Sequence, residues 1–356
     1  MKIAICKFAG MGNGGIEKYL QTLSIILKKN GYDVDFFYTN WAPIIGSSWT
    51  HPNNDKARIE YVKSQGINLI EISVEARNDL NQYEWVNTDF FNHFNEEDYE
   101  FIIFGGNGVP EFPYNKLDNI KIIHTVHGDN VFNKNNIHKS VLLSQWQANR
   151  WISKGGNPSK LEIIPSIVYT PETYTKTLRE RYNIPSDAFV YGFHQRNDNS
   201  ISSSVSLEAY SRIQDDNTYF AILGGADLHR DYVKYNNLKN VIFVDYTSNV
   251  NDIHDFLDGI DVYAHCRLDG EVCSASIIEA MYHKKPLISY PGLNMGHLEQ
   301  LENCGKMTYS VDEYKIEMIK LRNKEYYDEI SERVKNKYYT FYDYKIVEKK
   351  LLNLLK

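Results

Sequence analysis

The sequence predicts an α/β protein built from two doubly wound domains with parallel sheets. Residues 2–8 form an apolar run, and residues 9–15 form a glycine-rich turn. A helical pattern follows at residues 16–30 and stops at Gly31, and a second apolar run lies at residues 34–38. This strand–turn–helix–strand order is typical of the start of a doubly wound domain. The same alternation restarts near residue 188, and 356 residues suit two domains at about 100–200 residues each.

The remaining apolar runs complete this pattern. In the first domain we expect strands at residues 67–72, 101–104, 120–126, 141–144 and 160–165, with a helix at 145–154 closed by two glycines. In the second we expect strands at residues 188–193, 219–223, 241–244, 261–264 and 286–289. The predicted domains are therefore residues 1–168 and 169–338, with a hinge near residues 170–174 and a helical end at 339–356. Residues 41–54 are polar and aromatic without a period, and predict either an acceptor-side loop or an ordered insertion.

Composition excludes several classes of protein. The formal net charge of −7 argues against a general nucleic-acid binder. No run approaches the roughly 18 apolar residues that span a bilayer, and the first residues read as a strand rather than as a signal peptide. The four cysteines form no C-x-x-C pair, which predicts reduced thiols in a cytoplasmic protein.

The most informative segment runs from Glu271 to Glu279, two carboxylates eight positions apart after a buried-looking strand. An apolar pattern predicts a helix from about Ser274, with Glu279 in its second turn and Glu271 in the preceding loop. Carboxylates bind hydroxyl groups, and free amides at a helix start bind anions. A sugar attached to a nucleoside diphosphate has both, although Glu279 could equally be a solvated helix residue.

Two features of the first domain also suggest a site. A glycine-rich turn that ends in Gly14 and Gly15 follows the first strand and opens a helix, where backbone amides can approach a phosphate. It lacks the dinucleotide-binding fingerprint, and such turns also occur for structural reasons. His127 lies at the end of a strand, whereas His124 reads as structural. A metal site formed by His124, His127 and Asp129 is the alternative interpretation.

These motifs resemble those of retaining, nucleotide-sugar-dependent glycosyltransferases of the GT-B fold, the family 4 or group 1 type with its Glu-x7-Glu motif. The resemblance covers nearly the whole chain in the right order, through Gly14-Gly15-Ile16-Glu17, His127, Arg196, Gly224-Gly225, and Glu271 with Glu279. The sequence departs from the family in two places. Val272-Cys273-Ser274 stands where the family has Gly-Phe-Gly, and Ile201 and Ser202 stand where a lysine is usual.

The resemblance implies two Rossmann-like domains that face each other across a donor cleft, with the last helix crossing back to the first domain. It implies that Glu279 holds the ribose, that Arg196 stabilises the leaving diphosphate, and that His127 orients the hexose. The missing lysine would be replaced by Arg267, His194 or the amides and hydroxyls of residues 199–204. The other implied donor-site residues are Glu271 with the amides of Val272, Cys273, Ser274 and Ala275 at the sugar, Gly14 and Gly15 near the phosphates, and Gly224 near the nucleoside.

The implied reaction transfers a hexose from UDP- or GDP-hexose to a hydroxyl of a glycan, a lipid-linked sugar or another acceptor. It needs no cofactor and no metal ion, and the expected location is the cytoplasm, with peripheral contact to a membrane also allowed. No nucleic-acid partner is expected. Two alternatives remain: a nucleotide-sugar-binding protein that has lost turnover, and a non-hydrolysing epimerase of related fold.

Overall fold

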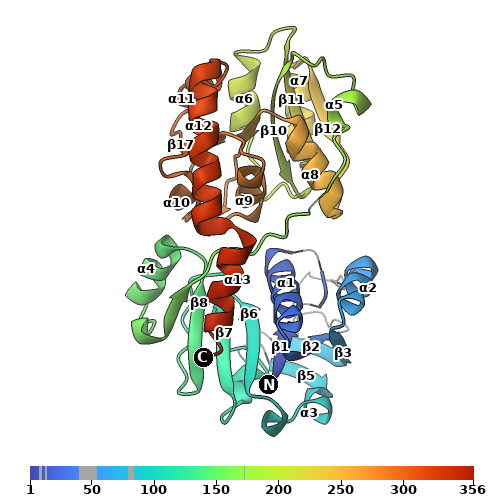
Figure 1. Ribbon diagram of the computed structural model, residues 1–356, viewed down its shortest axis with the longest axis vertical. Coiled ribbons are helices and arrows are strands. Elements are labelled where there is room, and N and C mark those ends of the chain that lie inside the picture. Colours follow the sequence, from blue (N-terminus) through green and yellow to red (C-terminus); the bar gives the residue numbers. More distant parts are fainter. Residues whose placement is uncertain (8–9, 13, 40–53, 79–83, 172) are drawn as a thin grey trace. The chain divides into compact units, whose positions relative to one another are not determined.

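The computed structural model describes residues 1–7, 10–12, 14–39, 54–78, 84–171 and 173–356. They form two compact units, the first made of Met1–Ile167 with Val347–Lys356 and the second of Val168–Ile346 (Figure 1). Residues 41–53, which carry most of the predicted acceptor-side loop or insertion, lie outside the described part, as does residue 172 in the predicted hinge.

The first unit is built on a seven-stranded parallel sheet. The order is β3 (Asn68–Ile72), β2 (Asp33–Thr39), β1 (Lys2–Lys7), β6 (Phe101–Gly106), β7 (Lys121–Val126), β8 (Ile137–Leu142) and β9 (Leu161–Ile163). Its helices are α1 (Gly15–Lys29), α2 (Lys56–Ser64), α3 (Phe90–His93) and α4 (Gln145–Ser153), with single 3₁₀ turns η2 (Glu96–Asp98), η3 (Tyr114–Lys116) and η4 (Pro158–Lys160). The antiparallel pair β4 (Val74–Asn78) and β5 (Glu84–Thr88), which the sequence pattern did not predict, is inserted after β3.

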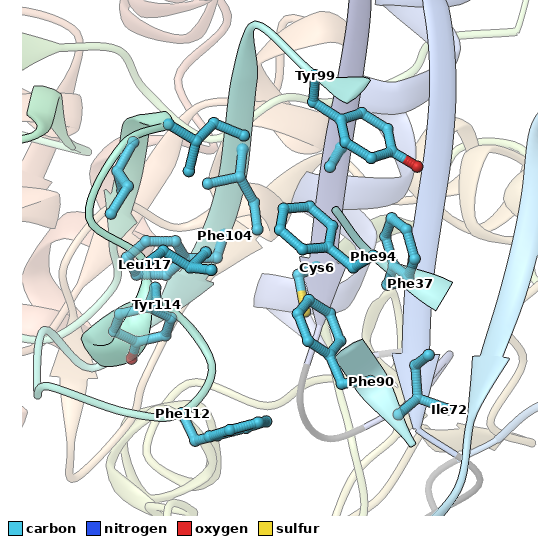
Figure 2. Close-up of a cluster of buried hydrophobic side chains, with 14 of the residues drawn as sticks. Cys6, Phe37, Ile72, Phe90, Phe94, Tyr99, Phe104, Phe112, Tyr114 and Leu117 are labelled. Atoms are coloured by element: carbon cyan, nitrogen blue, oxygen red, sulfur yellow. The ribbon is translucent and has the colours of Figure 1, made fainter. Parts of the chain in front are cut away.

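One face of this sheet is covered by aromatic side chains (Figure 2). Phe90, the first residue of the short helix α3, and Phe94, which directly follows that helix, stack with ring centroids 4.9 Å apart. They close over Phe37 of β2, whose ring meets both of them edge to face. Burying such large rings supplies much of the hydrophobic stabilisation of the unit.

The second unit has the strand order of a dinucleotide-binding fold. Its parallel sheet runs β12 (Val241–Val244), β11 (Thr218–Gly224), β10 (Phe189–Gln195), β13 (Val262–Ala264), β15 (Leu287–Ser289) and β17 (Gly305–Met307). Its helices are α5 (Leu178–Arg181), α6 (Val205–Ser211), α7 (Asp227–Tyr235), α8 (Val250–Gly259), α9 (Ala275–Tyr282), α10 (His297–Leu301), α11 (Val311–Lys320) and α12 (Lys324–Lys337). All six strands are parallel, and the direction in which successive strands are added to the sheet reverses between β10 and β13. Ligands of open α/β sheets bind at such a switch point.

The predicted α/β class with two doubly wound, Rossmann-like sheets is confirmed. Several predicted boundaries were wrong. β8 begins at Ile137 rather than at residue 141, and β10 continues to Gln195. The helical end is divided into a π-helical turn η5 (Tyr338–Tyr342) and α13 (Tyr344–Asn353), separated by Asp343. The end of α13 belongs to the first unit, where the carbonyl oxygen of Leu354 lies 3.1 Å from Nε2 of His138.

Candidate functional site

The Glu271–Glu279 segment folds locally as its sequence predicts. β13 ends at Ala264, a two-residue strand β14 (Gly270–Glu271) follows, and α9 begins directly after Ser274. The Ser274 hydroxyl caps α9 by accepting a hydrogen bond from the backbone N–H of Ile277 at 3.4 Å. Glu279 therefore lies in the second turn of the helix, and Glu271 lies in the connection that enters it.

The Glu271 carboxylate is held by several donors on one oxygen. Arg267 Nη1 donates a hydrogen bond to Oε1 of Glu271 at 2.9 Å, and the Ser274 hydroxyl donates to the same oxygen at 3.2 Å. Nε2 of His265 lies 3.6 Å from this oxygen. Burial alone would raise the pKa of Glu271, but His265 and the positive charge of Arg267 outweigh it and hold this pKa below its usual range. The carboxylate is therefore ionised at neutral pH and fixed in orientation.

A second short strand fixes the Glu271 backbone. β16 (Asn294–Met295) pairs with β14, and a Cβ atom on Gly270 would lie 1.9 Å from the carbonyl oxygen of Asn294. Gly270 has φ +62°, a conformation that glycine adopts readily. The close pairing therefore needs glycine at this position and limits the movement of the Glu271 backbone.

The residues after Glu271 differ in their access to a ligand. Cys273 and Ser274 are buried, Val272 is half-buried and Ala275 is exposed. The backbone N–H of Ser274 donates to Oε1 of Gln300 at 2.8 Å, and the Gln300 amide donates back to the Ser274 carbonyl at 3.0 Å. The expectation that the Ser274 amide is open to a sugar therefore needs correction, because a buried side chain already occupies this donor.

Glu279 reaches across from α9 to the end of β10. Its Oε2 lies 2.7 Å from Nε2 of His194, and the side chains of Glu279 and His194 are 20% and 10% exposed. His194 was one of the cations expected at the diphosphate, but the structure pairs it with Glu279. The two residues are 85 positions apart, so no local pattern could have indicated this contact.

The loop after β10 carries Arg196, whose side chain is 59% exposed and pairs with Asp198 at 2.9 Å. The hydrogen bond from the Ser200 hydroxyl and the positive charge of Arg196 lower the pKa of Asp198, so this carboxylate is also ionised.

The residues that stand in place of the usual lysine lie beside Arg267. Ser202 forms a single antiparallel bridge with Arg267, and the N–H of Leu268 donates to the Ile201 carbonyl at 3.0 Å. The positions that replace the usual lysine are thus next to Arg267 in space.

The Gly224–Gly225 turn packs against the same end of β10. Both glycines have φ +74°, and a Cβ atom on Gly224 would lie 2.3 Å from the carbonyl oxygen of Gln195. The N–H of Gly225 donates to that carbonyl at 2.8 Å. The glycines therefore let the end of β11 approach the end of β10, and α7 begins immediately afterwards at Asp227.

In the first unit the glycine-rich turn adjoins a buried ion pair. Lys7 at the end of β1 lies 3.2 Å from Glu17 of α1, and their side chains are only 7% and 9% exposed. Gly14 precedes α1, and a Cβ atom there would lie 2.1 Å from Oε2 of Glu17, whereas the space around Gly15 is open. Lys7 was not among the predicted site residues. The only sign of it in the sequence is a lysine at the end of an otherwise apolar strand.

His127 follows β7 and packs edge to face on Tyr19, with ring centroids 5.1 Å apart. Burial, together with the nearby charge of Lys7, lowers the pKa of His127 to about 3, so its imidazole is neutral. Its Nε2 is buried without a hydrogen-bond partner in the described residues. His124 instead stacks on Phe104 inside the unit, at a centroid distance of 4.4 Å.

Within the described residues, no three His, Cys, Asp or Glu side chains gather as they would around a metal ion. In this same part of the chain, no helix combines the length and the apolar character needed to cross a bilayer.

The segment that carries Arg196, Gly224, Glu271 and Glu279 also matches a family model. Residues 174–339 match the model of the glycosyl transferases group 1 family. The predicted resemblance to this family is confirmed, and the match covers most of the second unit. No curated protein matches the chain by sequence.

Solved structures agree with the assignment of the fold. The Anabaena HepE protein, crystallised with UDP and glucose, has a TM-score of 0.73 at 14% identity, with 100% of this chain and 99% of that chain covered. A glycosyltransferase from Rickettsia africae has the same TM-score and identity, with 100% and 97% covered. WaaG, described as a glycosyltransferase of lipopolysaccharide biosynthesis, has a TM-score of 0.67 at 14% identity, with 99% of both chains covered. At these identities the likeness establishes the GT-B fold.

Proposed function

We propose that this protein is a retaining glycosyltransferase that moves a hexose from a nucleoside-diphosphate sugar to a hydroxyl acceptor. The observation that carries the proposal is the placement of Glu271 and Glu279 at one end of the second sheet. Both carboxylates lie beside the Arg196 loop, within the segment that matches group 1 glycosyl transferases. One end of one sheet thus offers acceptors for sugar and ribose hydroxyls and a cation for phosphates.

Each residue then has a chemical role. Glu279 accepts hydrogen bonds from the ribose hydroxyls, and Glu271 does so from the hexose. Arg196 is the group best suited to the diphosphate, because a guanidinium donates to phosphate oxygens in pairs and its side chain is largely exposed. Its charge matters most as the glycosidic bond breaks, so its main effect is on the transition state.

The remaining donor-site assignments extend this proposal. Gly224 adjoins the nucleoside, and the backbone of Val272, Cys273 and Ala275 contributes to the sugar site. The amide of Ser274 is excluded because Gln300 occupies it. Arg267 is bound to both Asp269 and Glu271, so its first role is to hold Glu271 rather than to meet a phosphate.

In the first unit, we assign His127 to the hexose as a neutral imidazole, and Gly14 and Gly15 to the donor phosphates. The buried pair of Lys7 and Glu17 holds the start of α1 next to β1. These assignments belong to the same proposal and follow the order of motifs in the family.

The reaction we propose keeps the configuration at the anomeric carbon. The acceptor oxygen attacks that carbon on the face from which the diphosphate departs, the bond to the phosphate oxygen breaks, and the leaving phosphate takes the acceptor proton. We propose UDP-hexose as the first donor to examine, since Anabaena HepE has been crystallised with UDP and with UDP-glucose. The acceptor is a glycan, a lipid-linked sugar or another hydroxyl compound, and the reaction proceeds in the cytoplasm without a metal ion.

The test measures donor binding and turnover separately. UDP-, GDP- and ADP-hexoses are compared by thermal shift, and release of hexose from the stabilising donor is then followed without an acceptor. We expect one donor to stabilise the protein and to be slowly hydrolysed, and we expect both effects to be weaker in Glu279→Gln. Glu325→Gln is the matched control, because Glu325 is an exposed carboxylate on α12.

The outcomes separate the candidates. Binding without any released sugar supports the second candidate, a binding protein that has lost turnover, which the absence of a lysine at Ile201 and Ser202 favours. Conversion of the donor to its epimer would identify an epimerase. Failure of every nucleotide sugar to stabilise the chain would contradict the proposal.

A further inference from the structure

His194 is placed by the sheet to face α8 and α9 rather than solvent. Side chains alternate along β10, so His194 shares a face with Gly192, where a Cβ atom would lie 2.9 Å from the Ile260 side chain. The imidazole meets the ring of Phe256 at 6.4 Å and that of Tyr263 at 5.6 Å, both edge to face. These neighbours fix the ring plane, which therefore presents one nitrogen to α9.

The two ring nitrogens of His194 have different surroundings. Nε2 lies 2.7 Å from Oε2 of Glu279, whereas Nδ1 is buried without a hydrogen-bond partner in the described residues. A hydrogen on Nδ1 would be a buried, unsatisfied donor, which is unfavourable. Nε2 is therefore the nitrogen that donates to the carboxylate of Glu279.

Glu279 and Glu271 are thus held by different kinds of group. The Arg267 guanidinium and the Ser274 hydroxyl donate to Glu271, whereas the imidazole of His194 contacts one oxygen of Glu279. This contact fixes the orientation of the Glu279 carboxylate. A carboxylate that must accept bonds from two neighbouring hydroxyls benefits from a fixed orientation, because less side-chain freedom is lost on binding.

We propose that His194 is a positioning residue that orients Glu279 toward the diol of the donor ribose. The inference rests on the proposed function, because it assumes that Glu279 receives the ribose. Nothing in this role requires His194 to touch the donor. Its contribution is therefore measured as selectivity for ribose hydroxyls.

The experiment compares binding of UDP and of 2′,3′-dideoxy-UDP to the full chain by calorimetry. His194→Gln and His194→Asn form the matched pair, since the Gln amide reaches the position of Nε2 while the shorter Asn amide does not. We expect the wild type and His194→Gln to prefer UDP by about tenfold, consistent with hydrogen bonds to a charged group. In His194→Asn and in Glu279→Gln this preference should largely disappear.

Two controls separate folding from positioning. His138→Gln changes a histidine of the first unit and should leave the preference intact. Thermal unfolding is measured for every variant, and His194→Phe replaces His194→Asn if the latter does not fold. A purely structural role for His194 would lower the melting temperature and leave the preference for UDP intact.

The possible failures are distinguishable. If Glu279→Gln loses the preference but His194→Asn keeps it, the role of His194 is refuted and the proposed function stands. If Glu279→Gln keeps the preference, the ribose assignment is wrong, and the role of His194 falls with it. If the wild type does not bind UDP, the same comparison is made with GDP and its 2′,3′-dideoxy analogue, and binding of neither nucleotide refutes the proposed function itself.

Discussion

The buried His297 should make the second unit sensitive to acid. His297 is fully buried at the start of α10, with Nδ1 3.4 Å from the Glu271 carbonyl and Nε2 3.4 Å from that of Tyr290. Burial, with a further contribution from His265, lowers the pKa of His297 from 6.5 to about 4. The unfolded chain therefore binds a proton more readily than the folded chain between these two pH values.

The size of the effect follows from linkage. Because the folded pKa lies below the unfolded one, the stability due to neutral His297 is present above about pH 6.5 and is lost as the pH falls toward about 4. At about pH 5 the unfolded imidazole is about 97% protonated and the folded one about 9%. One pKa unit corresponds to about 1.4 kcal/mol, so lowering the pH from about 7.5 to about 5 should remove about 2 kcal/mol of unfolding free energy.

The assay is urea unfolding of the wild type and of His297→Gln at these two pH values, followed by far-ultraviolet circular dichroism. The variant should be less stable at neutral pH but should lose about 2 kcal/mol less than the wild type on acidification. Tryptophan fluorescence is an internal control, because all five tryptophans lie within residues 41–151 and report on the first unit. An identical acid loss in the wild type and His297→Gln would refute the reasoning.

Four further predictions follow from the described contacts. Gly224→Ala should destabilise the protein by more than about 1 kcal/mol in a thermal scan, because the backbone at this position has φ +74° and the added Cβ atom would lie 2.3 Å from the Gln195 carbonyl oxygen. In the same scan Gly15→Ala should be neutral or stabilising, because the Cβ atom added there would meet no atom from elsewhere in the described residues within 4 Å. Lys7→Met should lower the free energy of unfolding in urea by about 3–5 kcal/mol, because it removes the cation paired with the buried carboxylate of Glu17. Adding Glu17→Gln should restore part of this free energy. Arg196→Ala should lower kcat in single-turnover donor cleavage by about 100-fold with a modest effect on donor binding, and Arg196→Lys should recover only part of the rate. Transfer should persist in EDTA.

Each of these expectations has an opposing result. Equal effects of the two glycine substitutions would show that the Gly224 backbone can relax. A double variant no more stable than Lys7→Met would show that the cost lies in packing rather than in charge. Wild-type turnover of Arg196→Ala would place the diphosphate elsewhere, and a loss of transfer in EDTA that Mn²⁺ restores would contradict metal-independent chemistry.

Local features of the sequence were sufficient for much of the fold. The order of strands and helices follows from apolar runs and glycine stops, and the start of α9 follows from Ser274 before an apolar helical pattern. The same reasoning failed where the pattern was weak. A two-residue strand such as β14 is too short to show a period, and the division between η5 and α13 at Asp343 interrupts a run that reads as one helix.

The sequence by itself determined which chemical groups the second unit offers, because Glu271, Glu279 and Arg196 belong to motifs with fixed spacing. Only the tertiary structure decided how those groups are held. His194 meets Glu279 because parallel crossovers bring the end of β10 next to α9, and Lys7 meets Glu17 because α1 packs back onto β1. Gln300 occupies the Ser274 amide for the same reason, since α10 folds back onto the start of α9. Such contacts depend on the packing of separate elements, whereas local spacing specifies only what each element carries.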